Sequence, residues 1–94
     1  MKKQRQTSGV FEQLGFDENE AANIRLRASM MDALIDEIER KKFTQAQTAK
    51  ALGVSQPRVS DLLHGKLHLF SMDMLVMLLS KVGMRVEMKV RRAA

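Results

Sequence analysis

The chain has 94 residues, carries a net charge of +5 at pH 7 and contains no cysteine, tryptophan or tyrosine. This length suits one compact domain. The absence of cysteine excludes disulfides and thiolate metal sites, and no apolar run approaches the roughly 18 residues of a membrane helix. Because only four phenylalanines are available for base stacking, the composition favours binding of duplex over single-stranded nucleic acid.

Positive and negative charges are segregated along the chain. Residues 10–39 contain eight acids against two bases, whereas residues 40–70 contain six bases against Asp61. Clustered basic residues are more often a solvated face than a binding site. The segregation nevertheless suggests one face for a polyanion and another face for a different partner.

Residues 1–16 are predicted to be a flexible basic tail that ends in an apolar latch. The latch consists of Val10, Phe11, Leu14 and Phe16. No apolar segment follows the first basic residues, so we expect no secretion signal and a cytoplasmic protein.

A long first helix is predicted over about Glu18–Lys41. Asp17 supplies a capping side chain, and Glu20 places a negative charge in the first turn. Apolar residues recur at steps of three and four, which predicts one buried stripe opposite an acidic face. The stripe comprises Ile24, Ala28, Met31, Leu34, Ile35 and Ile38.

Two short helices are predicted next. Thr44 and Gln47 have the spacing of a capping box, which starts a helix over about Gln45–Leu52, and Gly53 ends that helix. Ser55 can cap a third helix, about Gln56–His64, which has a proline in its first turn and a glycine after its last. The segment from Thr44 to Gly65 therefore has the form of a helix-turn-helix.

The last two predicted elements are a helix over about Met72–Val82, capped by Ser71 and ended by Gly83, and a strand. After Gly83 the apolar residues alternate with charged ones, which is typical of a half-buried strand. The apolar set is Met84, Val86, Met88 and Val90, and the charged set is Arg85, Glu87, Lys89 and Arg91. A single strand needs a partner for its backbone groups, so we expect it to pair with the same strand of a second subunit.

The third predicted helix carries the side chains best suited to reading bases. Val59 and Leu62 should face inward, which leaves an outward set of Gln56, Pro57, Arg58, Ser60 and Asp61. Arg58 can donate two hydrogen bonds to guanine in the major groove, and Gln56 can pair with adenine. Gln45, at the start of the second helix, can meet a phosphate.

The segment TQAQTAKALGVSQPRVSDLLHGK resembles the helix-turn-helix of the phage-repressor or Cro-like (XRE) family. The likeness lies in the TQ start, the LGVSQ turn and the L-x-G-K end. Outside this segment, VFEQLGF, FSMDML and the alternating end are similar to a small subgroup of HigA-type antitoxins, which are encoded beside RelE-like or HigB-like toxins.

The resemblance implies a lambda-repressor-like bundle, binding to palindromic operators as a dimer, and repression. Carried over by position, it implies base contacts by Gln56, Arg58 and Asp61. The implied phosphate contacts are Gln45, Ser55, Ser60, His64 and Lys66. Asp61 departs from the family, which often has an uncharged or basic residue there; it can accept from cytosine or repel other sequences.

Other functions have weaker support in the sequence. Two short helices can also be plain scaffolding. His64 and His68 stand four residues apart, but Gly65 interrupts the helix between them and no cysteine or nearby carboxylate completes a zinc site. No arrangement of nucleophile, base and acid and no phosphate-binding loop is found, so we expect neither an enzyme nor a cofactor.

The sequence thus predicts an all-α fold of about four helices with a C-terminal strand paired across a dimer. Its parts are the tail and latch at 1–16, a helix-turn-helix domain at 17–83 and a dimerisation strand and tail at 84–94. The predicted function is a sequence-specific double-stranded DNA-binding regulator, a homodimeric repressor. The alternative is an antitoxin whose acidic first helix docks a basic toxin and which represses its own operon.

Overall fold

The structure, a computed structural model, describes residues 17–93. The predicted tail and apolar latch therefore lie outside the described residues. The elements are α2 (Glu18–Lys41), α3 (Gln45–Leu52), α4 (Gln56–Leu63), the short 3-10 turn η1 (Leu67–Leu69) and α5 (Met72–Lys81). The prediction of four helices is confirmed, and η1 is the one element in this range that was not predicted.

The helix ends follow from side chains close in sequence. Asp17 and Glu20 form a reciprocal capping box at the start of α2, and Ser71 accepts a hydrogen bond from the Met74 amide at the start of α5. Gly83 follows α5 with a φ of 85°, a left-handed conformation that favours glycine. These contacts set the boundaries of the two scaffold helices independently of the rest of the fold.

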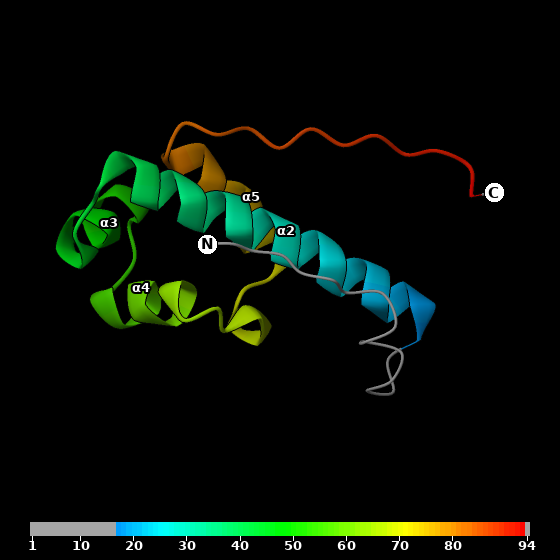
Figure 1. The fold of residues 1–94 in the computed structure, drawn as a ribbon, viewed down its shortest axis with the longest axis horizontal. Coiled ribbons are helices and arrows are strands. Elements are labelled where there is room, and N and C mark those ends of the chain that lie inside the picture. The colour runs from blue at the N-terminus through cyan, green and yellow to red at the C-terminus, as the bar shows by residue number, and fades with distance from the viewer. Residues whose placement is uncertain (1–16, 94) are drawn as a thin grey trace.

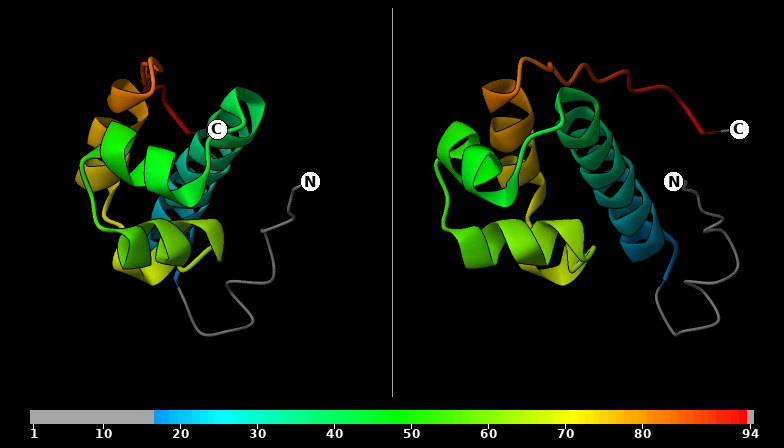
Figure 2. Two further views of the ribbon diagram at one scale, coloured as in Figure 1. Left: turned by 90° about the vertical axis from the view of Figure 1, so that its left-hand side faces the viewer. Right: turned by 60° about the vertical axis from the view of Figure 1, so that its left-hand side comes forward.

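The four helices form two groups. Helix α2 crosses the molecule and packs along α5, while α3 and α4 lie together at one side of this pair (Figure 1). Figure 2 shows α3 above α4, with α2 on the far side of the bundle. Because α4 also contacts α2, and α3 also contacts α5, the two short helices are seated on a scaffold of the two others.

The core is formed by one apolar stripe from each scaffold helix together with the inner sides of α3 and α4. Of the predicted α2 stripe, Met31, Leu34 and Ile38 are buried, and the other three members are half-buried. The four residues predicted for the last helix are all buried: Leu75, Leu78, Leu79 and Val82. Phe70, which precedes α5, is also buried and was not predicted.

The predicted C-terminal strand is not supported. From Met84 to residue 93 the chain runs as an extended segment that joins no sheet (Figure 1), and residues 17–93 contain no strand. The physical reason is that a strand needs a neighbour for its backbone groups, and this range of the chain offers no second strand. Strand pairing within residues 17–93 therefore does not explain why apolar and charged side chains alternate in this segment.

No helix within residues 17–93 is long and apolar enough to span a lipid bilayer. The longest, α2, has an acidic first turn with Glu18 and Glu20 and a basic last turn with Arg40 and Lys41. These charges complement the helix dipole at both ends.

We predict that Leu34→Ala lowers the free energy of unfolding by about 2–5 kcal/mol, because it removes a large side chain from a closed core. Leu34 is 0% exposed. The matched control is Leu26→Ala on the same helix, where the side chain is 57% exposed, and it should change stability by less than about 0.5 kcal/mol. Urea titrations followed by far-ultraviolet circular dichroism measure both values, and equal losses would contradict the assignment of the core.

Candidate nucleic-acid interface

Helices α3 and α4 and the turn between them form a helix-turn-helix. The predicted capping box is present: the Thr44 hydroxyl accepts from the Gln47 amide at 3.1 Å, and the Gln47 side chain accepts from the Thr44 amide at 2.9 Å. Gly53 follows α3 with a φ of 72°, so the chain reverses where an L side chain would be strained. Local capping therefore sets where α3 begins and where it ends.

Thr48 strengthens this arrangement from inside. It is fully buried on α3, and its hydroxyl donates to the Thr44 carbonyl at 2.8 Å. A buried hydroxyl with a partner on its own helix carries no desolvation penalty for an unmade bond. Helix α3 can therefore present a close-packed polar residue to its neighbours while its first turn, with Gln45 exposed, faces solvent.

The first turn of α4 is the most open part of this motif. Ser55 caps the helix, since its hydroxyl accepts from the Arg58 amide at 3.3 Å, and Pro57 occupies the first turn as predicted. Ser55, Gln56 and Pro57 are exposed, whereas Val59 and Leu62 are buried. The inward face of α4 is thus as predicted, and the predicted outward face is exposed at Gln56 and Pro57.

Arg58 is held against the protein. Its side chain is half-buried, and its guanidinium donates to the Leu69 carbonyl at 3.2 Å and lies 5.5 Å from the centre of the Phe70 ring. That distance is typical of a cation–π contact. Arg58 was predicted to lie on the outward face of the helix; its side chain is half-buried and also contacts the segment after α4.

Asp61 and Ser60 also have partners on the protein. The Asp61 carboxylate lies 3.7 Å from the Lys66 ammonium, and the Lys66 amide donates to the Asp61 carbonyl at 3.0 Å. The His64 Nδ1 donates to the Ser60 carbonyl at 2.8 Å and lies 3.3 Å from the Ser60 hydroxyl. Asp61 therefore offsets part of the charge of Lys66, a role that its position in the sequence did not reveal.

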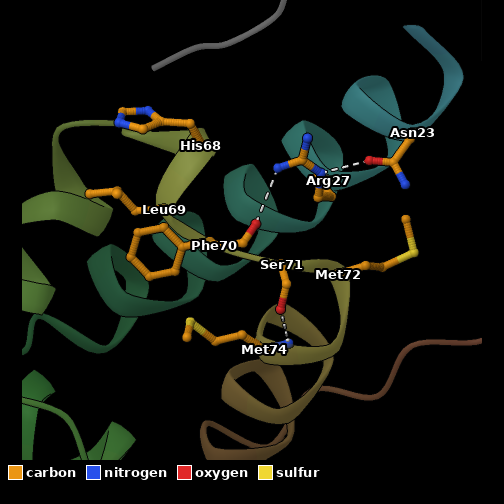
Figure 3. A pocket seen from close by; sticks show the side chains of 8 residues that line it. All are labelled: Asn23, Arg27, His68, Leu69, Phe70, Ser71, Met72 and Met74. Carbon is orange, nitrogen blue, oxygen red and sulfur yellow. Dashed lines mark hydrogen bonds between the residues drawn. The ribbon is translucent and has the colours of Figure 1, made fainter. Parts of the chain in front are cut away.

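The segment after α4 is held by a second arginine, from α2. Arg27 donates from one terminal nitrogen to the carbonyls of Leu67 and Phe70, each at 3.2 Å, and from its Nε to Asn23 at 2.8 Å. Figure 3 shows Arg27 directed at the Phe70 carbonyl, with Asn23 beside it on α2. An open pocket of about 510 Å³ adjoins these contacts, with His68 and Met72 among its lining residues.

Sequence reasoning missed Arg27 and Phe70. Both act over long separations, since Arg27 reaches partners 40 and 43 positions away. The only available signal was an arginine within the apolar half of a helix pattern, which is weak because arginine stems often lie on apolar surfaces. Residues 17–93 hold no cluster of three or more histidines and carboxylates of the kind that binds a metal.

The predicted site residues lie on one connected part of the fold: the first turn of α3, the whole of α4 and the segment that follows it. Six are exposed, namely Gln45, Ser55, Gln56, Pro57, His64 and Lys66. Three are half-buried, namely Arg58, Ser60 and Asp61. This exposed helix on a helical scaffold defines a DNA-binding domain of the helix-turn-helix class.

Comparisons with known proteins agree with that class. A family model described as a helix-turn-helix domain matches residues 10–91, so the chain belongs to this helix-turn-helix family. A solved structure described provisionally as an XRE-family transcriptional regulator shares 34% sequence identity with it and has a TM-score of 0.72. The match covers 76% of this chain and 80% of that one. No curated protein matches the sequence.

The family and the similar structure make the protein an XRE-like, DNA-binding regulator of transcription. A helix-turn-helix regulator of this kind binds double-stranded DNA. The predicted XRE resemblance is thus confirmed at the level of the family.

We predict that Arg58→Ala weakens binding to a cognate duplex by about 1–3 kcal/mol and relaxes preference at one base pair, because a bidentate guanine contact is lost. Competition binding against a panel of single-base variants measures both effects. The contact with Phe70 complicates the result, because loss of Arg58 also loosens the segment after α4.

Phe70→Leu is the matched control. Phe70 is 1% exposed and cannot touch DNA, but the substitution removes the ring below the guanidinium. If Arg58 reads a base, only Arg58→Ala changes the preference at that position. Relaxation of the same position by both variants would mean that Arg58 acts by holding the protein rather than by contacting guanine.

Proposed function

We propose that the protein is a dimeric repressor that binds a pseudo-palindromic operator, with one copy of α4 in each of two successive major grooves. The observation that carries this proposal is the open first turn of α4, where Gln56 and Pro57 are exposed at the end of a capped, close-packed helix. A rigid helix with a polar, exposed start is what groove reading requires. Occupancy of the operator then blocks transcription.

The roles of individual residues follow from their chemistry and position. Gln56 can pair with adenine, and Arg58 can reach guanine by exchanging its bond to the Leu69 carbonyl for bonds to the base. Asp61 can accept from cytosine, although its carboxylate is shared with Lys66. The phosphate contacts are assigned to Gln45, Ser55, Ser60, His64 and Lys66.

Two copies are needed because the readable surface of one copy is small. One copy of α4 offers three base-reading candidates, whereas a two-fold dimer doubles the contacts and matches a palindrome. We propose that the segment 84–94 dimerises the chain by pairing with the same segment of a second copy. Selection of bound duplexes from a random pool tests the whole proposal; recovery of sites without two related halves would contradict it.

We predict that Lys66→Ala weakens binding to all duplexes alike and lowers the slope of log affinity against log salt by about one unit per subunit, because a phosphate contact is lost. Titrations of cognate and random duplexes over a range of salt measure the slope. The control is Arg25→Ala on α2, which removes the same charge from an element outside the helix-turn-helix and should leave the slope nearly unchanged.

Asp61→Asn separates the two roles of the aspartate. If Asp61 only offsets Lys66, this variant should bind every duplex somewhat more tightly, since the ammonium is then free for phosphate. If Asp61 reads cytosine, the variant should instead lose its preference at one base pair.

For the Lys66→Ala experiment, a salt slope equal to that of the unaltered chain argues against a phosphate contact by Lys66.

We predict that deletion of residues 84–94 yields monomers in sedimentation velocity and abolishes specific binding at concentrations where the full chain saturates its operator. The helical core should persist, since the buried residues of the described part, 17–93, all lie between Ala21 and Val82. Circular dichroism of the shortened chain checks this point. A shortened chain that stays dimeric would move the interface onto the helices.

The second candidate function is an antitoxin that neutralises a RelE-like or HigB-like toxin and represses its own operon. The observation in its favour is the acidic surface of α2, which suits a basic, RNA-handling partner. Part of that surface is already neutralised: Glu37 pairs with Arg40 at 2.6 Å and with Lys41 at 3.5 Å. The hydrogen bond from Arg40 holds the pKa of Glu37 below its usual range.

The reading frame next to the gene discriminates the two candidates. A basic chain of about a hundred residues beside it supports the antitoxin function. Titration of that purified protein with this chain, with and without Asp36→Lys, then tests docking on α2, because Asp36 is exposed on that helix. Binding that survives the charge reversal would contradict docking at that face.

A further inference from the structure

Residues 84–93 form what we name the C-terminal arm, an extended segment beyond α5. Its apolar face begins on the protein, since Met84 packs against the core. Exposure then rises along the same face, from 38% at Val86 to 77% at Met88 and 83% at Val90. The chain's own helices therefore cover the start of this face and leave its outer half open.

The backbone of the arm is also open. Among the described residues, the last backbone hydrogen bond at this end is donated by the Met84 amide to the Leu79 carbonyl at 2.9 Å. Figure 2 shows the arm leading away from α5 and running out past α2. An extended segment with free donors and acceptors and one apolar face is a template for a further strand.

We infer that the occupant is the same arm of a second copy, paired antiparallel with the two-fold axis at Met88. The inference rests on the dimeric function proposed above, and it names the register that joins the two copies. Apolar residues face apolar residues only in registers whose axis passes through a residue, because side chains alternate between the two faces. Charge, length and the number of facing apolar pairs then select among the few axes that remain. An axis at Lys89 brings two ammonium groups together and sets Val86 opposite the partner's Arg92, so it loses an apolar pair that an axis at Met88 keeps.

An axis at Glu87 brings two glutamates together and places Arg85 opposite Lys89 of the partner subunit, so every charged pair repels. An axis at Val86 pairs opposite charges, but the ladder then stops early, because Gly83 is left-handed with a φ of 85° and cannot continue a strand before Met84. An axis at Met88 permits a ladder over residues 84–92. It places Glu87 of each copy opposite the partner's Lys89, and only the outer pair of Arg85 and the partner's Arg91 repels.

The Met88 axis also accounts for the exposed end of the arm. It places Val90 opposite the partner's Val86, next to the place where the partner's arm rests on its own core. The most exposed apolar side chain of each arm is thereby carried to the edge of the other copy's core. A two-stranded ribbon is marginal by itself, and contact with a core at each end supplies the support that it needs.

The chain contains no cysteine, so single cysteines report the axis directly. In the full-length protein without DNA, Met88→Cys should form a disulfide-linked dimer in oxidised glutathione at least about tenfold faster than Val86→Cys or Val90→Cys, because only a residue on the axis faces its own copy. Leu26→Cys, 57% exposed on α2, measures random collision. If Val86→Cys is fastest, or no arm position exceeds Leu26→Cys, the assigned register is wrong.

Charge exchange tests the same register without oxidation. Glu87→Lys and Lys89→Glu should each weaken dimerisation by roughly tenfold, since either variant places like charges opposite each other twice. An equimolar mixture of the two should dimerise as well as the unaltered chain, because both facing pairs are then opposite in sign. Sedimentation equilibrium measures all four samples, and a mixture no stronger than its components overturns the pairing.

These outcomes are separate from those for DNA binding. A monomeric full-length chain that still selects a palindrome would overturn the arm pairing and leave the regulatory function intact. Correct crosslinking and charge exchange in a chain that selects no DNA sequence would support the pairing and contradict the repressor function. A chain that stays monomeric by itself and binds a different protein through the arm would also overturn self-pairing.

Discussion

Two arginines donate hydrogen bonds to three backbone carbonyls in the segment between α4 and α5. Arg27 of α2 donates to Leu67 and Phe70, and Arg58 of α4 donates to Leu69. A hydrogen bond from a charged donor is stronger than one from a neutral donor. The segment is therefore attached at once to the scaffold helix and to the exposed helix of the motif, with the Phe70 ring buried beneath it.

This attachment ties the placement of α4 to the scaffold. The exposed first turn of α4 depends on its own cap at Ser55, but the direction of the helix depends on what its inner face and its end contact. Val59 and Leu62 provide the apolar part, and the ion pair between Asp61 and Lys66 closes the C-terminal end. Preorganisation of this kind lowers the entropy lost when a helix is fixed in a groove.

Local rules made most of the fold predictable. The boxes at Asp17 and Thr44, the cap at Ser55 and the reversal at Gly53 act within a few residues, so their positions follow from sequence alone. The outward residues of α4 could be named for the same reason, but their partners could not. Arg58 finds its acceptor in the loop after α4, and Arg27 finds its acceptors 40 or more positions away. The prediction of a C-terminal strand was not supported for a different reason. Alternation predicts an extended backbone, which is found, but a sheet needs a second strand, and residues 17–93 contain none.

The separation of the core from the arm has a consequence for how the protein responds to its own abundance. Within residues 17–93 the buried residues all belong to the helical part, so each copy can fold without waiting for another. With pairing confined to an exposed arm, occupancy of an operator would instead rise with the square of the concentration while copies are mostly single. In a cell that keeps the regulator at a concentration near its dimer dissociation constant, operator occupancy would change steeply with protein concentration although each copy is a small, non-cooperative domain.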